Sequence, residues 1–494
     1  MKVVNFWKKF DSPTLMLIGG IIFWVALYAV IGPRIGQDFI YFADAGINFA
    51  KGDGLVEAGT YGNPTLEYKY YATYPPVYPF LYGLYVYFFG VGEHQNTFFN
   101  VLLRLTRSIL LFIMVFKYAD GLSRNQKNIF SFLLILFAPS GNSYDRPEDL
   151  VTALFLISLL FYLGQKYEIA FLIAGLNLMV SPVCGLIGNI TLLGIYFQDV
   201  FKEKTDWENL LKKFYPVLYI LIFPVLIIAF LAFLDPSIFV RFYNYVKLLR
   251  EEIRPPGIAY LKSVITDKMF ISVISFYSFL LTLIFGVLMA WLAYKASEKK
   301  LASSILLVIG LVTLLNWEGR MNYYQYFSAY TLLIGIYVLM LKIEKLKSIR
   351  NTGFLLCFGL LVLLGLFSTT RDVYVRAFPM SYEKYKDAKK QVREFFKDKQ
   401  KYHFIEVAPQ YYFFLKDINP KICAGIIFDK NQSPKYIVEY PQRKDSVIVL
   451  RSHSYRRVFE TDKSMPNPQN TFAERLLLRS HETWYPVIYE RVDK

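Results

Sequence analysis

The side chain best placed for chemistry, Asp38, lies at the start of one long loop, residues 36–90, which follows the first apolar run of the chain. That run is long enough to cross a membrane, so Asp38 would stand a few residues beyond a span. The loop is too long for a simple connector and too apolar for a free tail. An acid at this place favours chemistry at the membrane surface. It could equally be a helix N-terminal carboxylate that the helix dipole stabilises.

Helical spacing divides the residues after Asp38 into two faces. One face carries Asp38, Tyr41, Phe42, Ala45 and Phe49, and the other carries Asp44, Asn48 and Lys51. Asp38 and Asp44 are about 120° apart at roughly 100° per residue, so they should not share one site. A wide apolar face with a polar edge suits a helix that lies in the membrane interface. This placement would put Asp38 at the mouth of any cavity between the spans.

Several cationic side chains lie in or near the apolar runs, where an ionisable residue is a candidate for a functional site. They are Arg146 in SYDRPEDL, Arg320 in NWEGRMNYYQY, Lys69, Arg254 in EEIRPPG, and Arg104 inside the second apolar run. Each could instead be an interface anchor or half of a structural ion pair, such as Arg320 with Glu318. The residue types alone leave both interpretations open.

The composition indicates that membrane helices must position these residues. Hydrophobic residues make up 55% of the 494 residues, and the mean hydropathy of +0.33 is high for a soluble domain of this size. Repeated apolar runs of roughly 17–25 residues match the thickness of a bilayer core. Much of the net charge of +16 lies in short loops beside these runs, and no basic helix or basic–aromatic motif indicates a nucleic-acid partner.

Hydropathy predicts about eleven membrane spans. They cover residues 14–32, 97–118, 128–143, 150–164, 167–182, 183–199, 214–234, 269–294, 301–316, 324–341 and 352–369. Lys and Arg are concentrated in alternate loops, which by the positive-inside rule are cytoplasmic. The sequence therefore predicts a cytoplasmic N-terminus and an extracytoplasmic C-terminal region.

The predicted fold class is a polytopic α-helical membrane protein with a small C-terminal extracytoplasmic α/β domain. We expect the transmembrane part over residues 1–371, including a first outer loop with interfacial helices at 33–96, and the α/β domain over 372–494. Long apolar runs vanish in the latter segment. A helix is predicted at 381–399, a short helix after Ala408-Pro409-Gln410, and strands at 402–407, 435–440, 446–451 and 484–491. We favour a scaffold or lid that supplies no catalytic residue.

Other motifs of known chemistry are missing from the sequence. The three cysteines and four histidines give no metal-ligand spacing, and only Cys423 falls in the predicted α/β domain, so no disulfide can form within it. The sequence contains no Walker loop, Rossmann glycine pattern or GxSxG elbow. ATP-driven transport and serine hydrolase chemistry lose most of their support. We predict neither a metal nor a cofactor.

The order of these features resembles the GT-C superfamily of integral-membrane glycosyltransferases, which includes the protein O-mannosyltransferases and the aminoarabinose transferase of lipid A. Those enzymes place an acidic residue just after the first span, follow it with a Pro-Pro element, matched here by Tyr74-Pro75-Pro76-Val77, and often end in an outer α/β domain. Two features depart from the family. Gln37-Asp38 stands where paired acids are common, and Tyr74 stands where aminoarabinose-type relatives have Lys. The absence of a WWD triad argues against the oligosaccharyltransferases.

The resemblance implies a single displacement at the outer face of a cell membrane, of the prokaryotic plasma or inner-membrane type. A polyprenyl-phosphate sugar would be the donor, and a lipid, glycan or protein hydroxyl the acceptor. Asp38 matches the catalytic acidic position and would act as general base. The departing lipid phosphate would need a cation. The candidates are Arg320, Arg146, Lys69 and Arg254 for the donor phosphate, and Tyr41, Tyr74, Tyr78 and Glu318 for substrate binding.

Two other function classes remain as alternatives. An O-antigen polymerase or ligase is also polytopic with arginines in outer loops, but its large loop usually comes later in the chain and a terminal α/β domain is not expected. A lipid or solute transporter is less favoured, because the sequence shows no inverted repeat and no pair of Gly/Pro-broken spans in matching halves.

The tyrosines of the first loop are typical of the headgroup layer, and one or two of them could stack on a sugar.

Overall fold

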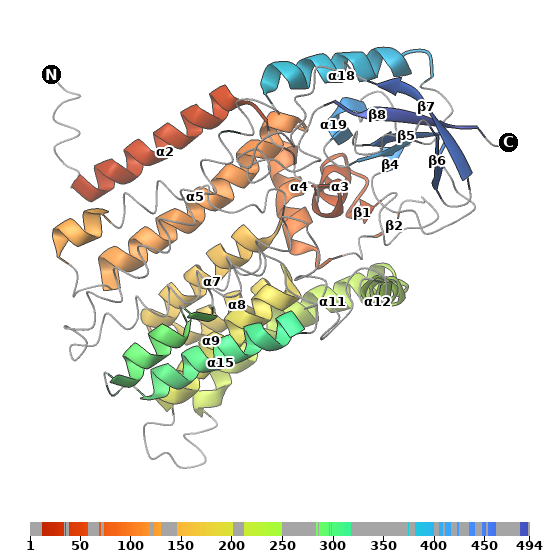
Figure 1. Ribbon diagram of the computed structural model, residues 1–494. Coiled ribbons are helices and arrows are strands. Elements are labelled where there is room, and N and C mark those ends of the chain that lie inside the picture. The colour runs from red at the N-terminus through yellow and green to blue at the C-terminus, as the bar shows by residue number, and fades with distance from the viewer. Residues whose placement is uncertain are drawn as a thin grey trace.

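The computed structural model describes most of the first two thirds of the chain and parts of the rest (Figure 1). The described residues are 12–33, 35, 39–57, 69–70, 74–118, 123–129, 146–200, 212–248, 283–284, 286–295, 297, 299–317, 374, 381–399, 405–408, 411–415, 422–423, 434–439, 447–450, 453–460 and 485–492. They form long apolar helices with a small sheet at one end.

Apolar runs form most of the helices, because their uncharged Leu, Ile and Phe side chains can cover the backbone all round. These helices are α2 (Ser12–Ile31), α5 (Glu93–Tyr118), α7 (Glu148–Leu163), α8 (Tyr167–Leu178), α9 (Pro182–Val200), η1 (Tyr215–Leu221), α11 (Ile222–Leu234) and α15 (Lys299–Trp317). The helix α12 (Ile238–Leu248) is amphipathic and carries Arg241 and Lys247. In the described part of the chain, three helices are long and apolar enough to cross a membrane: Glu93–Tyr118, Pro182–Val200 and Lys212–Leu234. Four shorter apolar helices accompany them.

The helical nature of the predicted spans is confirmed wherever the structure describes them. Helices cover most or all of the predicted runs 14–32, 97–118, 150–164, 167–182, 183–199, 214–234 and 301–316. The runs 324–341 and 352–369, nearly all of 128–143 and more than half of 269–294 lie outside the described residues. The number of crossings therefore stays a prediction.

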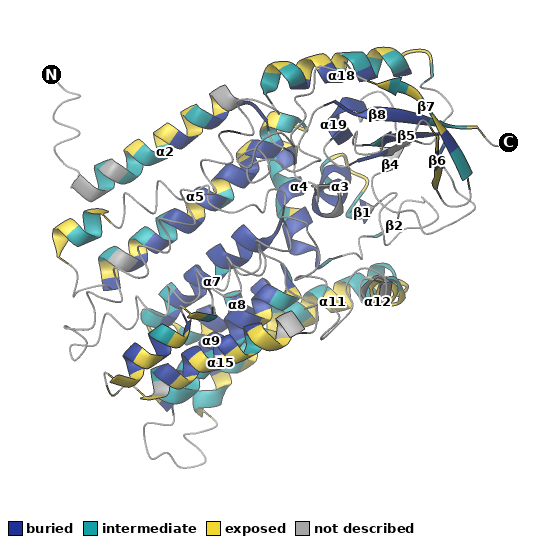
Figure 2. Ribbon diagram, viewed as in Figure 1, coloured by how far each residue is buried: buried dark blue, intermediate teal, exposed yellow. Residues whose placement is uncertain are grey.

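A buried apolar cluster holds α7, α8, α9 and α15 together. Phe155 and Leu156 of α7 pack there with Phe171 of α8, Leu192 of α9 and Ile305 of α15. The burial map shows the inner sides of these helices as dark blue stripes (Figure 2). This bundle supports α7, whose first turn carries the charged residues described below.

Two helices and two short strands occupy the predicted first outer loop. They are α3 (Phe39–Ala50), α4 (Val77–Phe89), β1 (Val56–Glu57) and β2 (Lys69–Tyr70). The helices α3 and α4 touch at two glycines: a Cβ on Gly46 would lie 2.4 Å from the carbonyl oxygen of Pro79, and one on Gly83 would lie 2.6 Å from that of Gly46. No larger residue fits this crossing without a shift of the backbone.

The C-terminal segments form a six-stranded mixed sheet in the order β4-β3-β5-β8-β7-β6. Its strands are β3 (Ile405–Val407), β4 (Ile422–Cys423), β5 (Tyr436–Glu439), β6 (Val447–Leu450), β7 (His453–Glu460) and β8 (Val487–Arg491). Strand β3 pairs in parallel with β4 and β5, and the remaining pairs are antiparallel. The predicted strands near 405, 436, 447 and 487 are confirmed, whereas β4 and β7 were not predicted.

Two helices accompany the sheet, α18 (Tyr382–Phe396) and α19 (Tyr412–Leu415), as the sequence predicts. The buried face of α18 carries Tyr385, Ala388, Val392 and Phe396, at spacings of one helical turn. These side chains share a buried cluster with α3 and α4 of the first loop. The C-terminal elements therefore lie at the same end of the helices as the first loop. This is the arrangement expected if the chain crosses the membrane an odd number of times, as the sequence predicts. The predicted domain boundary at 371/372 lies outside the described residues.

Candidate functional site

The first turn of α7 carries two adjacent carboxylates, Glu148 and Asp149. Acids are favoured at a helix N-terminus, because the helix dipole is positive there. Neighbouring residues on a helix point about 100° apart, so the two carboxylates reach different partners. Both are buried, and from the next residue, Leu150, the helix is almost entirely apolar.

Glu148 binds the guanidinium group of Arg146 through two contacts. Arg146 Nη2 lies 3.1 Å from Glu148 Oε1, and Arg146 Nε lies 3.2 Å from Glu148 Oε2. A guanidinium and a carboxylate that meet through two parallel hydrogen bonds fix each other's orientation. The candidate cation Arg146 is thus held in place at the start of α7.

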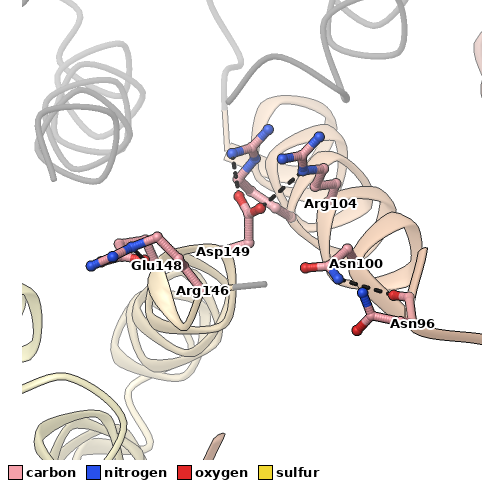
Figure 3. A network of polar contacts seen from close by, with 7 residues as sticks. Asn96, Asn100, Arg104, Arg146, Glu148 and Asp149 are labelled. Carbon is pink, nitrogen blue, oxygen red and sulfur yellow. Dashed lines mark hydrogen bonds and ion pairs between the residues drawn. The ribbon is translucent and has the colours of Figure 1, made fainter. Parts of the chain in front are cut away.

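Asp149 reaches the neighbouring helix α5 and binds two of its arginines (Figure 3). Arg104 Nε lies 3.1 Å from Asp149 Oδ2, and Arg107 Nη1 lies 2.7 Å from Asp149 Oδ1. Asn96 and Asn100 continue the same face of α5 toward its start, and the Asn100 amide donates to the Asn96 carbonyl at 2.9 Å. Since α5 is long and apolar enough to cross a membrane, Arg104, Arg107 and Asp149 are ionisable groups in or beside a candidate span, where such groups are candidates for a functional site.

The predicted first outer loop reaches this charged cluster through Phe42. The guanidinium carbon of Arg146 lies 5.2 Å from the centre of the Phe42 ring, a cation–π contact. Phe42 is the fourth residue of α3, which begins at Phe39, directly after Asp38 in the sequence. The charged start of α7 and the start of α3 are therefore neighbours.

The Pro-Pro element brings two predicted substrate residues to the same ring. The backbone N–H of Val77 donates to the Met179 carbonyl at 3.2 Å, which ties the start of α4 to the end of α8. The Tyr74 ring centre lies 4.6 Å from that of Phe42, and the Tyr78 ring centre lies 5.9 Å from it. Tyr74 is half-buried, whereas Tyr78 is 2% exposed and packs in the core.

Helix α3 is buried on all sides over residues 42–48, unlike the interfacial helix with a polar edge that its pattern suggested. The reason is that Tyr412 of α19 and strand β1 cover the expected polar edge. Tyr412 Oη donates to Asp44 Oδ1 at 3.2 Å, and Asn48 Nδ2 donates to the Val56 carbonyl at 2.9 Å and to Asp44 Oδ2 at 3.5 Å. Asp44 thus links the first loop to the C-terminal elements.

Comparison with known proteins gives one match at the level of structure. No protein-family profile and no curated protein matches this sequence. The described fold is similar to the crystal structure of the Archaeoglobus fulgidus oligosaccharyltransferase in complex with Zn and sulfate, with 13% sequence identity and a TM-score of 0.41. The alignment covers 83% of this chain and 62% of that chain.

Several predicted site residues lie outside the described residues. These are Asp38, Arg254, Glu318 and Arg320. Lys69 lies in β2, paired in register with Glu57, and Tyr41 lies in α3, but their side chains are not described. Of the predicted set, Arg146, Tyr74 and Tyr78 come together around Phe42. The described residues contain no group of three His, Cys, Asp or Glu side chains that could hold a metal ion.

Sequence reasoning missed Arg107, Glu148 and Asp149 as members of this cluster. One signal could have found them: Arg104 and Arg107 are three residues apart in an apolar run, so they share a helix face and need an acid nearby. The acidic first turn of the next described long apolar helix is such a partner. The pairing itself depends on how α5 and α7 pack, which the sequence pattern does not give.

Proposed function

We propose that this chain is a membrane glycosyltransferase of the GT-C kind, which transfers a sugar from a polyprenyl-phosphate donor to an acceptor hydroxyl at the outer membrane surface. One observation carries the proposal: the guanidinium carbon of Arg146 lies 5.2 Å from the Phe42 ring centre, so the start of α3, which follows Asp38 in the sequence, is next to the charged start of α7. A carboxylate near the acceptor and a cation near the phosphate are what this transfer needs.

The reaction is a single displacement. The acceptor oxygen attacks the anomeric carbon of the sugar and forms the new C–O bond, while the bond from that carbon to the lipid phosphate oxygen breaks. The proton of the acceptor hydroxyl goes to the carboxylate of Asp38, and the electron pair of the broken bond leaves with the polyprenyl phosphate. A positioned base of this kind contributes about 10²–10⁴-fold to the rate.

The described residues would play supporting roles at the phosphate. Arg146, oriented by Glu148, is the predicted phosphate candidate whose side chain is described, and it contacts Phe42 of α3. Arg320, Lys69 and Arg254 remain further candidates for the phosphate, and Glu318 and Tyr41 for the substrates. Tyr74, half-buried beside Phe42, is placed to contact a sugar. The protein would be a multi-pass protein of the cell membrane, with the N-terminus cytoplasmic and the C-terminal elements outside.

Asp38→Asn tests the proposal against a matched control, Asp44→Asn. Both changes remove one carboxylate from the same loop with little change in shape. The purified variants are reconstituted in nanodiscs with a panel of polyprenyl-phosphate sugars and a membrane extract as acceptor, and released polyprenyl phosphate is measured. Asp38→Asn should lose about 10²-fold or more of the transfer rate at unchanged thermal stability.

Asp44→Asn should keep most of the transfer, because Asp44 is buried against Tyr412 and its amide replacement still accepts that hydrogen bond. Full transfer by Asp38→Asn would remove the general base from the proposal. Equal losses in both variants would mean that the loop needs its negative charge and has no specific base.

A further inference from the structure

A groove of about 550 Å³ lies along the outer face of α18, against the start of α5. Its walls carry five basic side chains, from Lys386, Lys389, Lys390, Arg393 and Lys397, and two acidic ones, from Glu93 and Glu394. Each basic residue lies three or four positions from at least one other, so together they form a single stripe on the helix. Helix α18 has exposed residues along its open side (Figure 2), and Lys386, Lys390 and Lys397 are among the exposed ones.

The helix α18 is fixed at the end where α2 finishes and α5 starts (Figure 1). Lys389 Nζ lies 3.1 Å from Glu93 Oε1, and His94 Nε2 lies 3.1 Å from Tyr382 Oη. The backbone of Gly32, one residue beyond α2, touches Tyr382 so closely that an added Cβ would lie 2.7 Å from the Cβ of that tyrosine. The groove thus lies at the common end of two adjacent apolar helices.

The flanks of these two helices are suited to lipid. Trp24 and Tyr28 of α2 pack with Val101 and Leu105 of α5 on the inside of the pair. On other faces of the same helices, Ile22, Phe23 and Leu102 are exposed apolar side chains. A phospholipid beside such helices places its acyl chains along the exposed apolar residues and its headgroup at their end, where the basic stripe lies.

Two tyrosines of the groove wall, Tyr382 and Tyr385, lie beside its basic side chains. Lys386 Nζ lies 4.2 Å from the Tyr382 ring centre, so the lysine lies over the aromatic ring. Burial, with the carboxylate of Glu93 nearby, raises the pKa of Tyr385 well above its usual range. A tyrosine hydroxyl is neutral at physiological pH already at its usual pKa of about 10, so Tyr385 adds no negative charge to the groove.

We propose that this groove binds the phosphate of an anionic phospholipid headgroup from the leaflet at the common end of α2 and α5. Clusters of four or more basic residues on an amphipathic helix at a membrane surface recognise anionic lipids, and each such residue contributes about fivefold to binding. The site lies on the outer side of α18, whereas the cluster around Arg146 lies between α5, α7 and α3. It does not depend on the proposed glycosyl transfer.

The test uses the full-length protein, purified in a neutral detergent and titrated with dioctanoyl phosphatidylglycerol, with binding followed by thermal shift and by native mass spectrometry. Dioctanoyl phosphatidylcholine and inorganic phosphate are the comparison probes. We expect phosphatidylglycerol to bind and stabilise the protein, with phosphatidylcholine and phosphate much weaker. Equal effects of the two lipids, or full competition by inorganic phosphate, would overturn the proposal.

Variants at three exposed lysines locate the site. Replacement of Lys386, Lys390 and Lys397 together by Gln should weaken phosphatidylglycerol binding on the order of 100-fold. Their joint replacement by Arg should retain it. The control Lys384→Gln removes a charge from the same helix outside the groove and should change binding less than twofold.

Folding can be checked in the same experiment, because the variants should melt like the wild type before lipid is added. Undiminished lipid binding by the triple Gln variant would overturn the proposal. Asp38→Asn should bind phosphatidylglycerol normally, so the lipid site and the proposed transfer can fail separately.

Discussion

Two buried carboxylates of this chain, Asp149 and Asp44, are held in different ways although each is 3% exposed. Asp149 binds the guanidinium groups of Arg104 and Arg107 and joins two adjacent helices. Asp44 accepts hydrogen bonds from the Tyr412 hydroxyl and the Asn48 amide, and its contact with Tyr412 spans 368 residues of sequence. Equal burial therefore does not imply an equal role.

The difference lies in what remains when each acid is removed. Loss of the Asp149 carboxylate would leave two buried guanidinium groups without that counter-charge, and a buried charge that loses its partner is strongly destabilising. Loss of the Asp44 carboxylate would remove an acceptor from two neutral donors, the Tyr412 hydroxyl and the Asn48 amide. This costs less than a buried charge without its counter-charge. The first acid fixes the helix pair, and the second attaches the C-terminal elements to the first loop.

Asp149→Asn should show the largest effect on stability. We expect a loss of about 3–5 kcal/mol, because the change leaves Arg104 and Arg107 buried beside a neutral amide. Thermal unfolding in one detergent measures it. The matched control is Asp235→Asn, since Asp235 pairs with Arg241 at 2.9 Å but its side chain is 24% exposed.

The control should lose less, about 1 kcal/mol, because this pair is only half-buried and solvent screens it in part. Similar losses in Asp149→Asn and Asp235→Asn would show that burial does not decide the strength of these pairs. The different costs expected for removing the carboxylates of Asp149 and Asp44 would then have no physical reason.

Tyr412→Phe should have an intermediate effect. It removes the hydroxyl that donates to Asp44, and a hydrogen bond to a charged group contributes about 1.5–3 kcal/mol. Hydrogen exchange at both α3 and α19 should become faster, because the change loosens the contact between them. Tyr455→Phe is the control, since its hydroxyl donates to the Pro434 carbonyl at 3.1 Å within the C-terminal sheet region.

We expect about 0.5–1.5 kcal/mol for Tyr455→Phe, with no change of exchange in α3. If Tyr412→Phe changed the exchange of α19 and left that of α3 unaltered, Asp44 would not be the link between the two regions.

Arg146→Lys should have the smallest effect on stability, about 1 kcal/mol, because lysine keeps the charge and one hydrogen bond to Glu148. It loses the second hydrogen bond and the flat group over Phe42. If Arg146 holds the donor phosphate, KM for the polyprenyl-phosphate sugar should rise for Arg146→Ala, and should rise less for Arg146→Lys if the positive charge alone suffices. A wild-type KM in both variants would exclude Arg146 from donor binding.

The sequence predicted the helices and most of the sheet because their patterns are local. Apolar runs and the period of Tyr385, Ala388, Val392 and Phe396 depend only on neighbours along the chain. Strand β4 was missed because two residues give no period, and β7 because HSYRRVFE contains three charged residues within a strand of eight. Charged residues are depleted in strands, and β7 tolerates them because its Arg456 and Glu460 are exposed while Tyr455 is buried.

The site was predicted less completely, because its contacts join distant segments. Arg146 and Tyr74 were chosen from the sequence, but nothing local shows that both approach Phe42. The pattern placed Asp44 on a polar edge, and it is buried because Tyr412 covers it. Spacing along a helix identifies a face, but what that face meets is decided by tertiary packing.

The contact between Asp44 and Tyr412 also sets a delay in the biogenesis of the protein. The two residues are 368 positions apart, and a ribosome that adds about 5–20 residues per second needs roughly 20–70 s to make the chain between them. During that time the first loop is already synthesised, while the segment that will cover α3 does not yet exist. Until then α3 lacks its contact with Tyr412. A chain stopped before residue 412 therefore contains every residue of the charged cluster but not the tyrosine that covers α3.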